Sequence, residues 1–585
     1  MSSEKRRAWR VPVLAGLGYG LCVYLSLPPV DAWPLTLASA GVLIWTACRC
    51  AARPARAALF FGVGTLPLWA CEEAWLFTVT PVGTPLLALY LAFFSALTVY
   101  VLATMRRAWP RVPMSVLAPL GWLAVEVFRG EVMFTGYGWF LLAHPLIDAP
   151  FLAAPAAVLG TYFVSGLVAA LAGGVVDIAA RAGVRRKWGI VGVASVVLVW
   201  TGVATLGSLG KPLAEGTIRV GIVQTNVPQS NKLAWTSEQI ARDFARFIEL
   251  TRALGKAEPR PEVIIWPETM FPGVSLNDRA VAAFEAVFRA NRQSDANPGE
   301  SLNAAMNRII RDVQREIGIP MLVGSNEAIG ARMERNADGR ARFAYDAKHN
   351  SVVLIHDGRI QDDRYDKVDL MPFGEVIPYV WRWSAVQRLV LAVGAGGMKF
   401  DLSPGAGIRT IELPGVNMPS SGPLRVATPI CFEVTRAGLC ARLVEGSGQG
   451  SVLLINLSND GWFGGIGGPV PSDAGRAQHL LAARWRCVEL GVPLVRAVNT
   501  GISSAVDARG RVLPVEVVAG MQRATRSDGA LVASVDVPFA AKRLRAGNGF
   551  GWAVMLAGWT VVLLGWVKGR QRRITDSSRA MTTPG

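Results

Sequence analysis

Long apolar stretches are the feature that most constrains how this chain can fold. Seven of them precede a polar region over 216–540, and one follows it. A helix needs roughly 17–25 apolar residues to cross a hydrocarbon core of about 30 Å. The stretches lie near residues 11–30, 35–52, 57–79, 84–105, 113–130, 150–179, 188–208 and 550–567. We therefore expect a multi-pass α-helical membrane bundle of about eight helices, with seven in residues 1–210 and the last in 548–570.

The composition fits a membrane protein that carries a polar domain. Hydrophobic residues make up 51% of the chain and charged residues 18%, a mixture unlike that of soluble enzymes. The net charge of +17 could indicate nucleic-acid binding. However, many of the basic residues gather in short clusters between apolar stretches, so we expect no nucleic-acid partner.

The basic clusters also predict the orientation of the chain in the membrane. Every second loop is rich in Lys and Arg, whereas the alternate loops, such as "LPPVDAWP" and "TPVGTP", contain almost none. Positive loops lie on the cytoplasmic side. The clusters fall within 5–10, 49–56, 106–111, 181–187 and 568–573. Both termini, including a tail over 571–585, are therefore expected in the cytoplasm, and the polar region on the opposite side.

Three acidic residues interrupt the apolar stretches. Glu72 and Glu73 lie in the third stretch, and Glu126 lies in the fifth. A carboxylate inside a membrane span is costly unless it reaches the interface or faces the interior of a bundle. We expect the interface, with the bundle interior as the alternative.

The polar region has a different periodicity. Short β-branched segments such as "TIRVGIVQTN", "EVIIWPET" and "SVLLINLSND" are separated by helical patterns such as "SEQIARDFARFIELTRAL". Strands that alternate with helices predict an α/β domain.

Three reactive side chains follow predicted strands of this domain. Glu268 closes "VIIWPE", Lys367 lies in "YDKVDLMPFGEVIP", and Cys431 ends "LRVATPIC". Taken singly, a strand-end Glu or Lys is more often at the surface, and a Cys is more often part of a core. Together they supply a base, a cation and a thiol, which are the groups that acyl transfer through a thiolate requires. Lys367 and the backbone N–H after Cys431 are candidate donors to the oxyanion.

Six stretches in order resemble a known family: "NVPQSNKLAW", "WPET", "YDKVDLMPFGEVIPY", "PICFE", "LSNDGWFG" and "ELGVPLVRAVNTGISS". They are similar to the carbon-nitrogen hydrolases of the nitrilase superfamily and, within them, to the bacterial apolipoprotein N-acyltransferases. The resemblance covers nearly the whole chain. It implies an α-β-β-α sandwich with a Glu–Lys–Cys triad over 216–540, between the seventh and eighth membrane helices.

The resemblance also implies roles for individual residues. Glu268 would be the general base, Lys367 would stabilise the tetrahedral intermediate, and Cys431 would be the nucleophile. Glu375 and Glu433 would support them. The aromatic residues implied in substrate binding are Trp235, Phe432 and Trp462. Family members often carry Tyr after the nucleophile, so any role of that hydroxyl is absent at Phe432.

The activity implied by the resemblance is a two-step acyl transfer in the bacterial inner membrane. Cys431 would take the sn-1 acyl chain of a phospholipid, expected to be phosphatidylethanolamine, as a thioester. The α-amine of a diacylglyceryl-cysteine at the N-terminus of an apolipoprotein would then accept it. The catalytic domain would be periplasmic, and the protein a monomer without a cofactor. The alternatives are a membrane-tethered nitrilase or amidase acting on a small amide, and a transporter or scaffold with an inactive outer domain.

Some features leave two interpretations open. The apolar segment 378–400 could be a lid or an ordinary buried helix and loop. Cys440 and Cys487 could form a disulfide, although separate buried thiols are the expectation. The four histidines, His144, His349, His356 and His479, lack metal-ligand spacing, so no metal site is expected.

Overall fold

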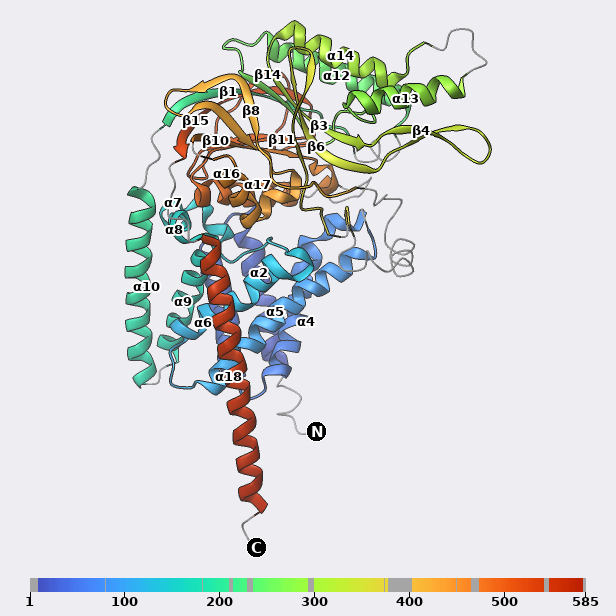
Figure 1. The fold of residues 1–585 in the computed structure, drawn as a ribbon. Helices are drawn as coiled ribbons and strands as arrows, with labels where there is room; N and C mark the ends of the chain where they lie inside the picture. Colours follow the sequence, from blue (N-terminus) through green and yellow to red (C-terminus); the bar gives the residue numbers. More distant parts are fainter. Residues whose placement is uncertain are drawn as a thin grey trace. The chain divides into compact units, whose positions relative to one another are not determined.

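The computed structural model divides the chain into two compact units, Met1–Lys211 with Leu544–Gly585, and Pro212–Arg543. The residues that it describes are 9–78, 80–180, 183–209, 214–228, 235–292, 299–372, 374–376, 402–448, 450–464, 473–540 and 547–581. The first unit is helical, and the second contains the strands (Figure 1).

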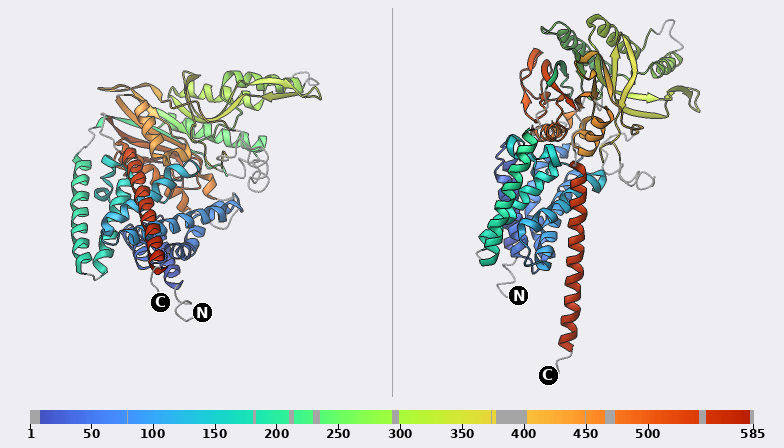
Figure 2. Two further views of the ribbon diagram at one scale, coloured as in Figure 1. Left: turned by 60° about the horizontal axis from the view of Figure 1, so that its bottom comes forward. Right: turned by 60° about the vertical axis from the view of Figure 1, so that its left-hand side comes forward.

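Over the described ranges, eight helices of more than ten residues make up most of the first unit. They are α2 (Arg10–Ser26), α3 (Leu35–Arg49), α4 (Pro54–Glu72), α5 (Gly83–Ala108), α6 (Met114–Val127), α9 (Thr161–Ala179), α10 (Gly183–Leu209) and α18 (Gly547–Met581). The C-terminal helix α18 lies alongside α5 and α6 (Figure 2), so the last stretch of the chain packs with the N-terminal helices.

The membrane prediction is supported in part. Among the described residues, four helices are long and apolar enough to cross a membrane: Gly83–Ala108, Thr161–Ala179, Gly183–Leu209 and Gly549–Lys568. Three apolar helices are shorter: Arg10–Ser26, Leu35–Arg49 and Pro150–Leu159.

The predicted single span over 150–179 is wrong in detail. It consists of α7 (Pro150–Ala153), α8 (Ala156–Leu159) and α9. The break before α9 falls at Gly160, whose φ of 82° is a conformation that glycine adopts without strain. The chain therefore turns within this apolar stretch instead of continuing as one helix.

The three acidic residues of the apolar stretches are buried within the helical unit. Glu72, Glu73 and Glu126 are 6%, 1% and 6% exposed. The Tyr137 hydroxyl donates to Glu73 Oε1 at 2.9 Å, and the Leu142 N–H donates to Glu126 Oε1 at 2.6 Å. The structure thus favours the bundle interior over the expected interface, because polar partners on loops and neighbouring helices are available there.

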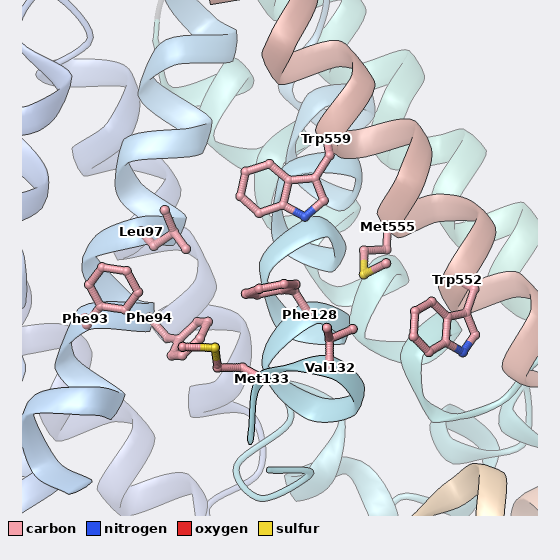
Figure 3. Close-up of a pocket in the computed structure, with 9 residues that line it drawn as sticks. All are labelled: Phe93, Phe94, Leu97, Phe128, Val132, Met133, Trp552, Met555 and Trp559. Atoms are coloured by element: carbon pink, nitrogen blue, oxygen red, sulfur yellow. The ribbon is translucent and has the colours of Figure 1, made fainter. Parts of the chain in front are cut away.

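An apolar groove of about 560 Å³ opens between helices of the same unit. Figure 3 shows the side chains that line it. They are Phe93, Phe94 and Leu97 of α5, Phe128 and Val132 of a π-helix (Phe128–Val132), Met133, and Trp552, Met555 and Trp559 of α18. Such a lining suits hydrocarbon rather than water or ions.

In the described part of the second unit, the strands form one 13-stranded sheet, which is best described as two halves. One half contains β1 (Ala214–Gln224), β2 (Val263–Trp266), β3 (Met321–Ile329), β6 (Ala347–His356) and β7 (Arg359–Asp366). The other contains β8 (Ile411–Met418), β9 (Gly422–Ala427), β10 (Gly450–Ser458), β11 (Leu494–Val498), β12 (Ser504–Val506) and β13 (Val512–Leu513). The long strand β15 (Gly529–Ala540) joins the halves, because it pairs with both β1 and β10, and β14 (Glu516–Gly520) pairs with it.

The apolar residues of these strands divide between two cores. In β2, Val263 and Ile265 belong to the core between the two halves, whereas Ile264 and Trp266 face the core beneath α12 (Ser237–Gly255) and α14 (Leu302–Ile317). This alternation follows from the period of two along a strand.

Figure 1 shows α12 and α14 on one side of the strands, and α16 (Ala437–Gly446) and α17 (Asp473–Leu490) on the other. The predicted α-β-β-α sandwich is confirmed. The small hairpin of β4 (Arg332–Arg335) and β5 (Ala341–Ala344), together with α13 (Asp278–Asn291), lies outside these layers.

Candidate active site

The strand directions bring the predicted reactive residues to one edge of the sheet. Strands β1, β2 and β3 are parallel, as are β9, β10 and β11. Because β6 is antiparallel to both β3 and β7, β7 runs in the same direction as β3. Because β15 is antiparallel to both β1 and β10, the two halves also run in the same direction.

Each predicted triad residue follows the carboxyl end of one of these strands. Glu268 is the second residue after β2, Lys367 is the first after β7, and Cys431 is the fourth after β9. In α/β sheets the carboxyl ends of parallel strands are where chemistry is usually located. Glu268 and Cys431, which are more than 160 positions apart in sequence, therefore lie at the same edge of the sheet as Lys367.

Lys367 lies between two carboxylates. Its Nζ is 2.8 Å from both oxygens of Glu375 and 3.5 Å from Glu268 Oε1. Lys367 is 1% exposed and Glu268 is 5% exposed. Although burial by itself lowers the pKa of Lys367, the carboxylates of Glu375 and Glu268 raise it above its ordinary value. The side chain is thus a fixed, buried ammonium group, which can stabilise a developing negative charge.

Glu268 is held by two donors besides Lys367. The Asn350 side-chain amide donates to Oε1 at 2.7 Å, and the Asn459 N–H donates to Oε2 at 2.8 Å. Both carboxylate oxygens are therefore oriented by neighbours on β6 and in the turn after β10. A carboxylate fixed in this way can accept a proton at a defined position.

Cys431 begins a short 3₁₀-helix, Cys431–Thr435, and its φ of 51° lies in the left-handed region. Such a conformation is unfavourable for a non-glycine residue and often marks a functional site. Burial and the nearby Glu268 carboxylate raise the pKa of the Cys431 thiol, whereas Lys367 opposes that rise. The sulfur therefore rests as a thiol and needs a base before it can attack a carbonyl.

Glu433 connects the turn that contains Cys431 to the segment that carries Lys367. Its Oε1 accepts hydrogen bonds from the Tyr365 hydroxyl at 2.9 Å and from the N–H groups of Val368 and Asp369 at 2.8 and 2.9 Å. Its Oε2 accepts from the Ile430 N–H at 2.8 Å. Because Glu433 is fully buried, these hydrogen bonds hold the residues on either side of Lys367 in a fixed position relative to Ile430, the residue before Cys431. Glu375 plays a similar part, since its Oε2 also accepts from the Met371 N–H at 2.8 Å.

The three predicted substrate-binding aromatics are placed differently. Phe432 is 4% exposed and lies within the domain. Trp462 is half-buried in a 3₁₀-helix, Asp460–Gly464, that follows β10. Trp235 donates from Nε1 to Asp243 at 2.8 Å and packs against the core beneath α12. These contacts leave their predicted role in substrate binding untested.

The structure answers one of the two questions that the sequence left open. Cys440 and Cys487 are both free and buried, which confirms separate thiols. The segment 378–400 lies outside the described residues, so its interpretation as a lid stays a prediction.

Sequence reasoning missed a buried polar cluster next to Cys431. Its members are Asn456, Asp460, His479 and Arg496, each at most 1% exposed. Asn456 and His479 contact the carbonyl oxygen of Cys431. One signal was available, because Arg496 interrupts the apolar strand "PLVRAV". An Arg at the centre of a buried strand requires partners.

Comparison with known proteins gives a consistent result. The model of the carbon-nitrogen hydrolase family matches residues 219–539, and that of the apolipoprotein N-acyltransferase N-terminal domain matches residues 19–174. A curated protein of Rhodopseudomonas palustris named apolipoprotein N-acyltransferase is 29% identical over 86% of this chain and 87% of its own. A protein of the same name from Brucella melitensis is 28% identical over the same shares.

Among solved structures, a carbon-nitrogen hydrolase from Helicobacter pylori G27 aligns with 63% of this chain and 99% of its own, at 15% identity and a TM-score of 0.32, which is too low to bear on the argument. The family assignment depends instead on the two family models, of which the hydrolase model alone covers more than half of the chain. The chain belongs to the carbon-nitrogen hydrolase family, and its N-terminal domain is that of the apolipoprotein N-acyltransferases.

Proposed function

We propose that this protein transfers an acyl chain from a membrane phospholipid to the N-terminal amine of diacylglyceryl-cysteine in apolipoproteins, through a thioester on Cys431. The observation that carries the proposal is the buried contact of Lys367 with Glu268 and Glu375, at the sheet edge where Cys431 lies. The name shared by the curated relatives supports the same activity.

In the first half-reaction, Glu268 takes the proton of the Cys431 thiol, and the sulfur attacks the carbonyl carbon of the sn-1 ester. The carbonyl electron pair moves onto oxygen. Lys367 and the Phe432 N–H are the proposed donors to this oxyanion. Its collapse breaks the ester C–O bond, and Glu268 returns the proton to the departing lysophospholipid oxygen.

In the second half-reaction, the α-amine attacks the thioester carbon and forms a second oxyanion at the same donors. Glu268 accepts a proton from the amine as the C–N bond forms. Collapse breaks the C–S bond and returns a proton to Cys431. Water must be excluded while the thioester waits, because hydrolysis would convert the transferase into a lipase.

The membrane unit suits substrates that are both anchored by lipid chains. We place the enzyme in the bacterial inner membrane, with eight spanning helices, cytoplasmic termini and a periplasmic catalytic domain. The basic clusters of alternate loops support this orientation. Phosphatidylethanolamine is the proposed donor, and a monomer is the proposed working form.

The test is mass spectrometry of the detergent-solubilised protein after incubation with phosphatidylethanolamine. Cys431 is expected to gain the mass of one acyl chain, and addition of a diacylglyceryl-cysteine peptide is expected to remove it. Cys71, an exposed thiol of the helical unit, is the internal control and should stay unmodified.

Two outcomes would contradict the proposal. Normal N-acylation by a Cys431→Ser variant would exclude the thioester. Labelling of Cys431 by a small amide, with none by phospholipid, would favour the amidase alternative.

A further inference from the structure

We propose that His479 is a positioning residue for acyl transfer: it donates a hydrogen bond to the Cys431 carbonyl and thereby aims and polarises the Phe432 N–H toward the oxyanion. The inference depends on the proposed thioester chemistry at Cys431. It assigns a purpose to a buried cluster that the two half-reactions do not otherwise use.

The cluster converges on one peptide oxygen. His479 Nε2 lies 3.2 Å from the Cys431 carbonyl oxygen. The side-chain amide of Asn456 donates to the same oxygen at 3.4 Å and to the Pro429 carbonyl at 2.7 Å. Two side chains, from α17 and β10, therefore hold the peptide that joins Cys431 to Phe432.

Arg496 holds both of these side chains in place. Its Nη1 donates to Asn456 Oδ1 at 2.9 Å, and its Nη2 lies 2.9 Å from His479 Nδ1. Asp460 neutralises the guanidinium, with Oδ2 at 2.6 Å from Nη2. All four residues are at most 1% exposed. A buried ion pair contributes little net stability, so a role in orientation explains its presence better than stability does.

The partners of His479 determine which ring nitrogen carries the proton. Burial and the adjacent Arg496 lower the pKa of His479, so the ring is neutral near pH 7. The guanidinium Nη2 can only donate, so Nδ1 accepts from it and Nε2 carries the hydrogen. Nδ1 is also 3.0 Å from Asp460 Oδ1, a contact that carries no hydrogen bond in this tautomer. The Nε2–H is thus the donor to the Cys431 carbonyl oxygen.

The held peptide is the one that would bind the oxyanion. Phe432 is the second residue of the 3₁₀-helix, and the first helical bond there runs from the Glu433 N–H to the Ile430 carbonyl at 3.1 Å. The N–H groups at the start of a helix have no partner within it. A hydrogen bond to a peptide's carbonyl strengthens donation by its N–H. It also holds the left-handed backbone of Cys431 at φ 51°.

Two substitutions of His479 separate this role from a structural one. In His479→Gln the amide nitrogen can occupy the place of Nε2 and still reach the Cys431 carbonyl. In His479→Asn the amide reaches only the place of Nδ1, so contact with Arg496 is kept and the donor to Cys431 is lost. The measurement is the rate of thioester formation on Cys431 at saturating phosphatidylethanolamine, with its KM, in the full-length protein.

His479→Asn is expected to slow thioester formation by about tenfold or more. Loss of a direct oxyanion donor lowers kcat by about 10²–10³-fold, and the loss here should be smaller because His479 acts on the donor peptide and not on the oxyanion itself. The KM is expected to stay unchanged, and His479→Gln is expected to stay close to the wild type. Alkylation of Cys431 by iodoacetamide needs the thiolate but forms no oxyanion, so both variants should react as the wild type does.

The outcomes distinguish this inference from the proposed function. Equal thioester rates in the two variants, or a parallel loss of acylation and alkylation, would overturn the role of His479. A p-nitrophenyl ester serves as a second acyl donor, because it forms the same oxyanion without a lipid. If the wild type reacts with that ester but not with phospholipid, the proposed function fails. The rates of thioester formation with that ester then still test the inference: a slower rate in His479→Asn than in His479→Gln supports it, and equal rates overturn it.

Discussion

Replacing Glu433 by Gln tests whether the link between the segment that carries Lys367 and the turn that contains Cys431 controls the proposed reaction. Burial raises the pKa of Glu433 to about 7, so the experiment is done at pH 8, where the carboxylate is ionised. Its two oxygens accept four hydrogen bonds, three at Oε1 and one at Oε2. A glutamine keeps the three bonds by placing its carbonyl at Oε1. Its NH₂ group then faces the Ile430 N–H. Both groups are donors, so that hydrogen bond is lost and the buried Ile430 N–H is left without an acceptor.

The expected cost follows from that count. A lost hydrogen bond to a charged group, with its donor left unsatisfied, costs about 2–3 kcal/mol. Glu327 provides a matched control in the same unit. It is 1% exposed and accepts three hydrogen bonds from Ser275, Leu276 and Asn277, residues that hold no part of the site. Glu327→Gln should lower stability by a similar amount.

The two variants should differ in activity. In Glu433→Gln the Ile430 N–H is released, and a displacement of about 1 Å at the nucleophile can cost about 10²-fold in rate. We expect at least a tenfold slower formation of the Cys431 thioester, with thermal unfolding shifted to the same extent as in Glu327→Gln, whose thioester rate should match the wild type. Equal rates in the two variants, at equal fractions of folded protein, would refute the reasoning.

Two further perturbations have clear expected results. Lys367→Met should slow thioester formation by about 10²–10³-fold and also slow alkylation of Cys431 at pH 8, because Lys367 opposes the rise of the Cys431 pKa; unchanged rates would contradict its electrostatic role. The pKa of His479 is lowered in the folded protein by burial and by Arg496, against the opposing effect of Asp460. At this residue the unfolded chain therefore binds more protons as pH falls through about 6.5, and the contribution of His479 to stability must fall with it. Glu433, whose pKa is raised, acts in the opposite sense but is present in both proteins, so between pH 8 and pH 5 the thermal stability of the wild type should fall relative to that of His479→Gln, and identical slopes would contradict it.

Much of the site was predictable because it depends on local pattern. A strand followed by a polar residue can be recognised in one sequence, and Glu268, Lys367 and Cys431 each follow a strand, although only the strand before Glu268 is buried throughout. Parallel strands place their carboxyl ends at one edge of a sheet. Once the α/β alternation was recognised, proximity of the three followed without knowledge of any contact.

The polar partners inside the fold were not predictable in the same way. The sequence pattern does not indicate that Glu73 meets Tyr137, which lies 64 positions away, or that His479 reaches the Cys431 carbonyl. A hydrogen bond depends on distances of a few tenths of an ångström and on angles. Only the packing of whole elements determines those quantities.

The sequence by itself predicted long apolar helices typical of a membrane protein, one α/β domain, and a Glu, a Lys and a Cys at strand ends. Hydrophobic periodicity and charge distribution act locally, and a reader can recognise them without a fold. The tertiary structure alone decided that an apolar stretch breaks at Gly160 and that buried carboxylates find partners within the helical unit. It also decided that Arg496 meets Asp460, Asn456 and His479, because a buried charge is stabilised only by groups that folding brings within hydrogen-bonding distance.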